Sequence, residues 1–200
     1  SVGQAQEKNR LLLTAFKLRF FEEVLKAKEL IEQGSLGKIL NFRLLFGGYM
    51  DMAGTWFVKK EISGGGVIMD NGPHAAALIQ HLFGDIAGVS ATALDAKNVG
   101  VEDTAKLTFS LKNGVTGTVD VSWAAWVTPA AYLEIYGEEG TLLLDGTGVT
   151  VKYKTWNDWR KIPNKGDAAA GFARQIDHFV KAIQENKTTM IDAQAGLKAQ

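Results

Sequence analysis

Residues 101–123 read VEDTAKLTFSLKNGVTGTVDVSW, and this stretch decides the fold class. Apolar side chains occupy alternate positions on both sides of an Asn-Gly pair: Leu107, Phe109 and Leu111 before it, and Val119, Val121 and Trp123 after it. Alternation with a period of two is typical of a strand with one buried face. Because Asn113-Gly114 is a strong turn signal between such strands, the stretch predicts an antiparallel hairpin with one apolar face.

More strands are expected on either side of this hairpin. In KILNFRLLFGGYM (38–50), one face carries apolar side chains and the other carries Asn41 and Arg43. The apolar positions are Leu40, Phe42, Leu44 and Phe46. Further strands are predicted at 10–16, 86–94, 131–136, 141–144 and 149–154, with a hairpin turn at 146–148.

Helical periodicity predicts the remaining elements. The segment FFEEVLKAKELIEQG (20–34) places Phe21, Val24, Leu25 and Ile31 on one face and stops at Gly34. Residues 73–83 are predicted as a helix ending at Gly84, and residues 2–9 as the tail of another. A helix near 170–185 presents the apolar face Phe172, Ile176, Phe179, Val180 and Ile183, and a last helix is expected to begin at Asp192.

This order of elements predicts an α+β fold. We expect a large, mostly antiparallel open sheet with helices packed on one face. The other face must meet water or a partner. We expect a subunit contact there, involving Trp123, Trp126 and the aromatic residues near 153–159.

Composition narrows the class of function. The chain carries 22 basic and 22 acidic residues, which argues against a broad nucleic-acid or membrane surface. It contains no cysteine, so disulfides, thiolate zinc sites and thiol catalysis are excluded. No apolar run reaches transmembrane length, and we expect a cytoplasmic protein.

The candidate site lies in GGGVIMDNGPHAAAL (64–78). Pro73 suits the first turn of a helix, which would put Asp70 at or before the cap and His74 in the first turn. The helix N-terminus disfavours imidazolium and the Asp70 carboxylate favours it. Together they would hold a neutral histidine able to accept a proton, as a general base must. The glycines would allow a ligand to approach the backbone closely.

The same residues also allow purely structural interpretations. Asp70 can be a helix cap and nothing more, and His74 a surface or core residue. A metal site from Asp70, His74 and His81 is disfavoured, because two helical turns separate the histidines by about 10 Å. The chain has neither GxGxxG after a strand nor GxxxxGK[ST], so it shows no nucleotide-binding fingerprint of its own.

The pattern W-x(7)-GGG-x(3)-D-x-G-x-H, from Trp56 to His74, resembles the Gfo/Idh/MocA family of NAD(P)-dependent oxidoreductases. Four other segments resemble that family in the same order: AFKLRF (15–20), IEQGSLGKI (31–39), the stretch 101–123 and FARQIDHFVKAIQENK (172–187). The resemblance implies that residues 1–16 are the trailing helix and strand of a missing Rossmann domain. Residues 17–200 would then be the C-terminal substrate-binding and oligomerisation domain, truncated at its C-terminal end.

The resemblance also implies roles. His74 would take the hydroxyl proton of a sugar, polyol or inositol while hydride leaves for NAD or NADP, and Asp70 would support it. Arg19, Trp56, Lys59 and Asn71 are candidates for binding the substrate. The resemblance also implies a Glu-Lys-Pro motif upstream, which is absent here. Because this chain shows no site for the nicotinamide, we expect it alone to bind no cofactor and to be inactive.

One departure from the family pattern concerns specificity. Many members carry an acid where this chain has Ala77, which leaves the substrate open. Two alternatives to an enzyme are a non-catalytic ligand sensor and a dimerisation domain of the same fold. In each case a homodimer or tetramer through the open sheet face is expected.

Overall fold

The computed structural model describes residues 2–8, 10–126, 129–187 and 193–200. At its centre is an open eight-stranded sheet in the order β2-β3-β4-β1-β5-β6-β7-β8. The strands are β1 (Ile39–Gly47), β2 (Ile86–Leu94), β3 (Thr104–Leu111), β4 (Thr116–Ser122), β5 (Leu133–Gly137), β6 (Gly140–Leu144), β7 (Gly148–Tyr153) and β8 (Arg160–Pro163). β1 and β4 are parallel and the other neighbours pair antiparallel. This mixed sheet confirms the predicted α+β class.

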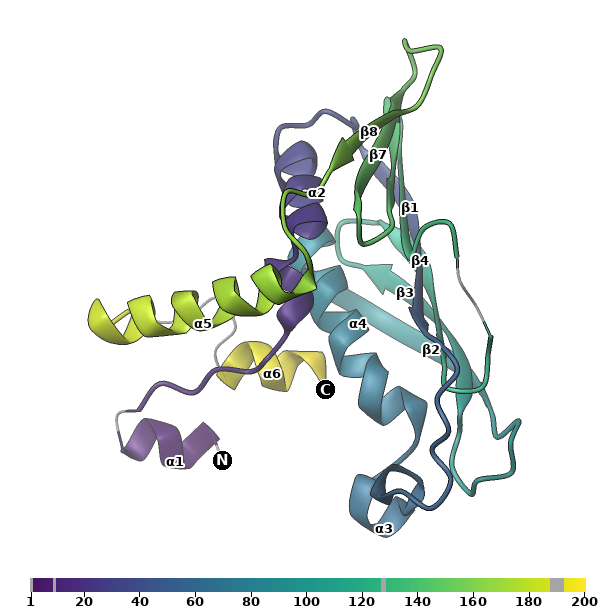
Figure 1. Ribbon diagram of the computed structural model, residues 1–200, viewed down its shortest axis with the longest axis vertical. Coiled ribbons are helices and arrows are strands. Elements are labelled where there is room, and N and C mark those ends of the chain that lie inside the picture. The colour runs from purple at the N-terminus through teal and green to yellow at the C-terminus, as the bar shows by residue number, and fades with distance from the viewer. Residues whose placement is uncertain (1, 9, 127–128, 188–192) are drawn as a thin grey trace.

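The helices gather on one side of the sheet (Figure 1). They are α1 (Val2–Glu7), η1 (Lys17–Phe20), α2 (Glu22–Glu32), η2 (Trp56–Val58), α3 (Lys60–Ser63), α4 (Val67–Phe83), α5 (Ala168–Gln184) and α6 (Ala193–Ala199). α2 and α4 lie against the sheet, whereas α1, α5 and α6 extend away from it. In the described part of the chain, no helix is both long and apolar enough to cross a membrane.

The predicted hairpin is confirmed as β3 and β4, and the six apolar side chains of its inner face are all buried. The outer face is polar. Lys106 pairs with Asp120 across this hairpin at 2.5 Å, and Arg43 pairs with Glu134 across β1 and β5 at 3.7 Å. Trp123 therefore faces the helices, and its expected part in a contact on the open face was wrong.

The main core lies between α4 and the sheet. The Phe42 ring of β1 stacks on Phe83 at the end of α4, with 4.8 Å between ring centroids. It also lies flat against Gly117 of β4, where a Cβ would come within 2.5 Å of the ring. Burying one such phenyl group contributes roughly 1.5–3 kcal/mol. Glycine at 117 is what makes room for it.

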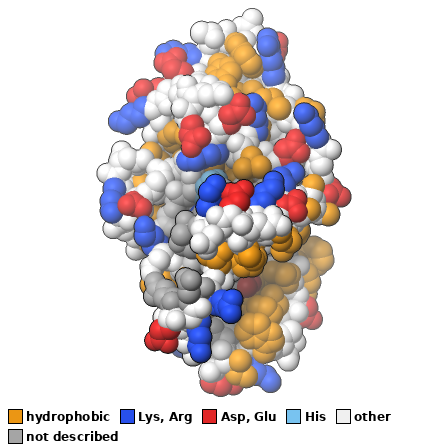
Figure 2. Space-filling view, turned by 90° about the vertical axis from the view of Figure 1, so that its left-hand side faces the viewer, with side chains coloured by type: hydrophobic (Ala, Val, Ile, Leu, Met, Phe, Trp, Pro, Cys, Tyr) orange, Lys and Arg blue, Asp and Glu red, His pale blue; other side chains and the backbone are white. Residues whose placement is uncertain are grey.

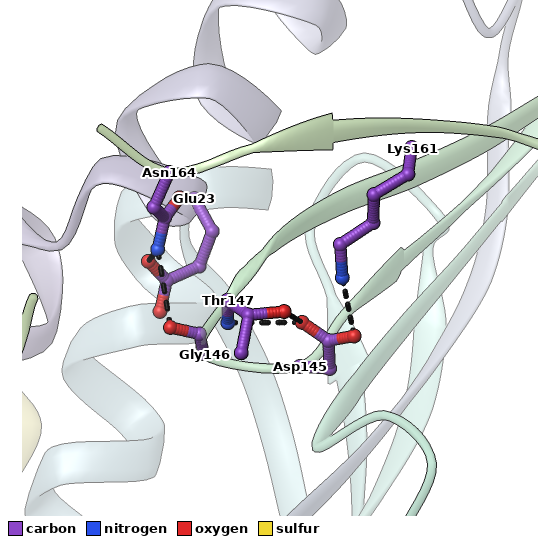
Figure 3. A network of polar contacts seen from close by, with 6 residues as sticks. All are labelled: Glu23, Asp145, Gly146, Thr147, Lys161 and Asn164. Carbon is purple, nitrogen blue, oxygen red and sulfur yellow. Dashed lines mark hydrogen bonds and ion pairs between the residues drawn. The ribbon is translucent and has the colours of Figure 1, made fainter. Parts of the chain in front are cut away.

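A buried polar network ties α2 to the far end of the sheet (Figure 3). The Glu23 carboxylate accepts hydrogen bonds from Tyr132 Oη at 3.1 Å and from Asn164 Nδ2 at 2.7 Å. Asn164 also donates to the Gly146 carbonyl in the β6–β7 turn. In that turn, Asp145 accepts from Thr147 and pairs with Lys161 of β8. A buried carboxylate is thus satisfied by neutral donors, which connect α2 to the segments around β5 and β8.

Two expectations about strands were wrong, and one strand was not predicted. Residues 10–16 form no strand, since only Leu13 makes an isolated bridge and Leu11 and Leu12 are exposed. β8 was missed because four residues carry too little pattern to detect. Leu40 is exposed because the β1–β5 register shifts between Ile39 and Asn41.

The predicted packing face of α2 was right in part, since Val24 is buried and Phe21 and Ile31 pack against the core, whereas that of α5 was wrong. α2 buries Glu23, Val24, Ala27 and Leu30, and leaves Leu25 exposed. α5 rests on η1 through its small and polar side, which comprises Gly171, Gln175 and Ala182. Its predicted face is largely open, with Phe172, Ile176, Val180 and Ile183 exposed. The start of α6 at Asp192 lies outside the described residues.

Candidate active site

Helix α4 carries the candidate residues, and it begins at Val67 rather than at Pro73. Its first turn is held by one residue from the loop before β3. Glu102 accepts the Val67 N–H on its backbone oxygen at 2.8 Å. Its side-chain Oε1 accepts the N–H groups of Gly66 at 2.9 Å and Ile68 at 3.3 Å. The N–H groups at the start of a helix lack partners within it, so Glu102 acts as a cap supplied from a distant segment.

The glycines before α4 serve this contact. A Cβ on Gly66 would lie 1.9 Å from the Glu102 carbonyl oxygen, so only glycine fits there. The close approach expected of a ligand is thus made by the chain itself. Pro73 consequently lies inside the helix, where it has no N–H to donate to the Met69 carbonyl.

Asp70 lies in the first turn of α4, where its own N–H donates to the Gly66 carbonyl at 3.1 Å. Its side chain is half-buried and points toward the sheet. Oδ2 accepts a hydrogen bond from Nε1 of Trp123 at 3.3 Å. Asp70 therefore connects the helix to the end of β4 and does not cap its own helix.

His74 lies one turn after Asp70, between two phenyl rings. The Phe16 ring meets the imidazole edge-on, with 5.7 Å between ring centroids. The Phe46 ring is tilted against it, with centroids 6.0 Å apart. Burial among these rings lowers the pKa of His74, the Asp70 carboxylate raises it, and Lys17 lowers it. The net direction is downward, so the imidazole is neutral at neutral pH. The expected helix-terminus effect is not the cause, because His74 lies beyond the first turn, where that effect has decayed.

The two nitrogens of the His74 ring differ in their surroundings. Nδ1 is buried and has no hydrogen-bond partner among the described residues. A proton exchanged with a bound molecule would therefore have to use Nε2.

Two of the four predicted substrate contacts, Asn71 and Arg19, are buried in packing around α4. Asn71 Nδ2 donates to the Phe46 carbonyl of β1 at 3.4 Å. Arg19 Nη2 donates to the Ala77 carbonyl at 3.0 Å, and its guanidinium lies over the Phe16 ring. Burial lowers the pKa of Arg19. The Ala77 side chain is itself fully buried.

The other two predicted contacts, Trp56 and Lys59, are exposed. Trp56 stacks on Phe57 at 4.0 Å, and the Phe57 ring meets Trp123 edge-on at 6.1 Å. Trp56 is thus linked to Asp70 through a chain of aromatic rings. Lys59 precedes α3, where its carbonyl accepts from Ile62 and Ser63, and its side chain is open to solvent.

Among the hollows that border this region, the two next to α4 and Trp123 are not lined by His74. One of about 740 Å³ runs along the Gly72, Pro73 and Ala76 side of α4, toward β2 and β3. The other, about 210 Å³, is bordered by Trp123 and Lys97. Figure 2 shows hydrophobic side chains gathered on the lower part of the face turned to the viewer, below a row of charged side chains. Across the described ranges, no three acidic or histidine side chains come together as metal ligands.

Several residues of the site were not predicted in these roles. Glu102 and Phe16 reach α4 from distant segments and carry no local signal. Phe46 and Trp123 were placed on the apolar faces of their strands, although Trp123 was also expected in a contact on the open face. Only the order of the strands shows that both reach α4.

Comparison with known proteins agrees with this architecture. A family model described as the GFO/IDH/MocA C-terminal domain matches residues 24–143. An uncharacterized oxidoreductase of Synechocystis sp. is 28% identical over 231 residues, covering 98% of this chain and 62% of the relative. Levoglucosan dehydrogenase of Pseudarthrobacter phenanthrenivorans is 26% identical over 176 residues, covering 70% of this chain and 43% of that enzyme.

Solved structures share the fold. Levoglucosan dehydrogenase in complex with NADH and levoglucosan superposes with a TM-score of 0.86 at 22% identity, over 97% of this chain and 63% of that one. Aldose-aldose oxidoreductase from Caulobacter crescentus, complexed with glycerol, gives 0.85 at 18% identity, over 99% and 61%. The chain therefore spans roughly three fifths of these proteins.

Proposed function

The chain belongs to the GFO/IDH/MocA family, and from this premise we propose that it is the substrate-side part of an NAD(P)-dependent dehydrogenase. The substrate class is a sugar, polyol or inositol-like alcohol. The observation that carries the proposal is the His74 imidazole, kept neutral by two phenyl rings beside the Asp70 carboxylate. A neutral imidazole next to an anionic carboxylate is able to accept a hydroxyl proton and to tolerate the resulting charge.

In this proposal His74 is the general base. Its Nε2 takes the proton of the reacting hydroxyl group, since Nδ1 is buried. Asp70 stabilises the imidazolium that forms, because an opposite charge favours the protonated ring. Phe16 and Phe46 exclude water from the parts of the ring that they cover, which strengthens the interaction between the two charges.

We propose that the glycine-rich segment of this chain does not hold the dinucleotide. Its glycine-rich segment leads from α3 into α4, not from a strand into a helix, and Glu102 already occupies the helix N-terminus. We therefore place NAD or NADP on a Rossmann domain outside these residues, with residues 1–16 belonging to its end. When bound, the nicotinamide would supply the hydride acceptor.

The substrate class is supported by two relatives, whose solved structures contain levoglucosan or glycerol. Exposed Trp56 and Lys59 are proposed to contact such a substrate directly. Arg19 and Asn71 are proposed to hold α4 in position beneath it. A cytoplasmic location and pairing of two or four copies through the open sheet face complete the proposal.

The test is turnover by the full-length protein. Sugars, polyols and inositols are screened with NAD and NADP, comparing the wild type with His74→Gln. Loss of a general base lowers kcat/KM by roughly 10²–10⁴-fold. His81→Gln, on the same helix, serves as the matched control and retains activity.

Three outcomes would contradict parts of the proposal. Equal turnover by wild type and His74→Gln would remove His74 from the chemistry. Binding of dinucleotide and sugar by the full-length protein without any turnover would favour a ligand sensor. Reduction of NAD by this chain alone would show that the cofactor site is wrongly placed.

A further inference from the structure

We propose that Trp123 is a positioning residue that holds the Asp70 carboxylate beside His74. The inference rests on the proposed function, since it names the group that keeps the acid of that site in place. It adds a residue from the sheet to a pair that lies wholly on α4.

The contact is well suited to this role. An indole N–H can donate but cannot accept, so a carboxylate oxygen is an appropriate partner. Trp123 Nε1 lies 3.3 Å from Asp70 Oδ2, and the tryptophan is 1% exposed. Solvent therefore has little access to the indole in place of the carboxylate. Breaking the contact would leave a buried donor unpaired, and this cost keeps the bond formed.

The indole is held by neighbouring segments. Trp123 follows the end of β4, where its backbone N–H donates to the Asp103 carbonyl and its carbonyl accepts from Met50, each at 2.8 Å. The Phe57 ring packs edge-on against the side chain. A donor fixed in this way can orient a carboxylate on a neighbouring helix.

The consequence falls on His74. The charged groups that act on its ring are Asp70 from α4, which raises its pKa, and Lys17 from η1, which lowers it. A carboxylate released from Trp123 would be free to turn toward water. His74 would then lose its anionic neighbour, while Lys17 and the burial would remain.

The first experiment measures the His74 imidazole in this chain. The chain is labelled with ¹³C-histidine and titrated by NMR as wild type, Trp123→Phe and Trp156→Phe. Phenylalanine keeps an aromatic ring and removes the donor. Trp156 is the matched control, since it packs on Tyr153 and Arg160 in another part of the sheet. We expect the His74 pKa to fall in Trp123→Phe and to stay unchanged in Trp156→Phe.

A double-mutant cycle tests whether Trp123 acts through Asp70. In the full-length protein, Trp123→Phe is expected to lower kcat/KM roughly tenfold, mainly through kcat. In an Asp70→Asn background the same change should have little further effect. Full additivity of the two losses, or an unchanged His74 pKa in folded Trp123→Phe, would overturn the proposal.

Two further results separate a failure of this proposal from a failure of the proposed function or of folding. Should Trp123→Phe fail to fold, the ¹⁵N–¹H signal of the Trp123 indole is compared between wild type and Asp70→Ala, and an unmoved signal would refute the contact. Should the full-length protein show no turnover, the proposed function fails, while the NMR titration still decides whether Trp123 positions Asp70.

Discussion

The cap that Glu102 places on α4 leads to a prediction about stability. Replacing Glu102 by alanine removes the Oε1 acceptor from the N–H groups of Gly66 and Ile68, and leaves the backbone bond to Val67 in place. Losing a side-chain cap costs typically ~1 kcal/mol. Losing the negative charge at the helix N-terminus costs about 0.3–1 kcal/mol more.

The two contributions together predict a loss of about 2 kcal/mol in the free energy of unfolding. For a chain of this length, each kcal/mol shifts Tm by roughly 2–4 °C, so we expect Tm to fall by about 4–8 °C. Glu102→Gln keeps an acceptor and loses only the charge. Its loss should therefore be about 1 kcal/mol or less.

Urea unfolding followed by far-UV circular dichroism measures both variants against Glu138→Ala, which removes an exposed carboxylate from the β5–β6 turn. The ranking expected is alanine at 102 least stable, glutamine intermediate, and the control within about 0.5 kcal/mol of the wild type. If Glu102→Ala were as stable as the control, the carboxylate would not be anchoring α4. The explanation given for its early start would then be wrong.

Three other predictions concern buried and exposed side chains. Burial lowers the pKa of His81 to about 4. The unfolded chain therefore binds a proton at this histidine below about pH 6.5, whereas the folded chain binds it only below about pH 4. Stability is therefore lost as pH falls through this window, and His81→Gln should flatten that slope in urea titrations run from pH 7 to 4.5. Tyr132→Phe leaves buried Glu23 with one donor fewer and should cost about 1–3 kcal/mol, against less than 1 kcal/mol for Tyr136→Phe on the open face, by the same assay. Ile176→Glu, at a side chain 56% exposed on α5, should change the stability of this chain by less than about 0.5 kcal/mol, whereas Leu107→Ala in the core should cost about 2–5 kcal/mol.

The parts of the fold that were predictable are those whose signal is local. Alternation around Asn113-Gly114 specified a hairpin and its buried face, and both are present. Gly34 and Gly84 marked the ends of α2 and α4 correctly. These features depend on residues close together in sequence, so one segment contains all the information needed.

Other features depend on what a segment packs against, and these were not predictable. The apolar stripe of α5 is real, yet the side of the helix buried against η1 is the adjacent one, and most of the stripe is exposed. Periodicity shows that a face is apolar and not which surface covers it. The same limit applies to residues 10–16, whose apolar run forms no strand in this chain.

The start of α4 shows how a local rule is overridden by a distant residue. Pro73 would serve well as the first residue of a helix, and sequence preference alone places the start there. Glu102 instead supplies partners to the N–H groups at Gly66, Val67 and Ile68, which extends the helix backward past Asp70. Because Asp70 then lies inside the helix, its side chain does not cap the helix and can accept a hydrogen bond from Trp123. His74 moves beyond the reach of the helix terminus, and its pKa is lowered by the two phenyl rings instead. The imidazole is neutral, as expected. The packing that lowers its pKa depends on residues 64–74 together with Glu102, Phe16 and Phe46, which come from other parts of the chain.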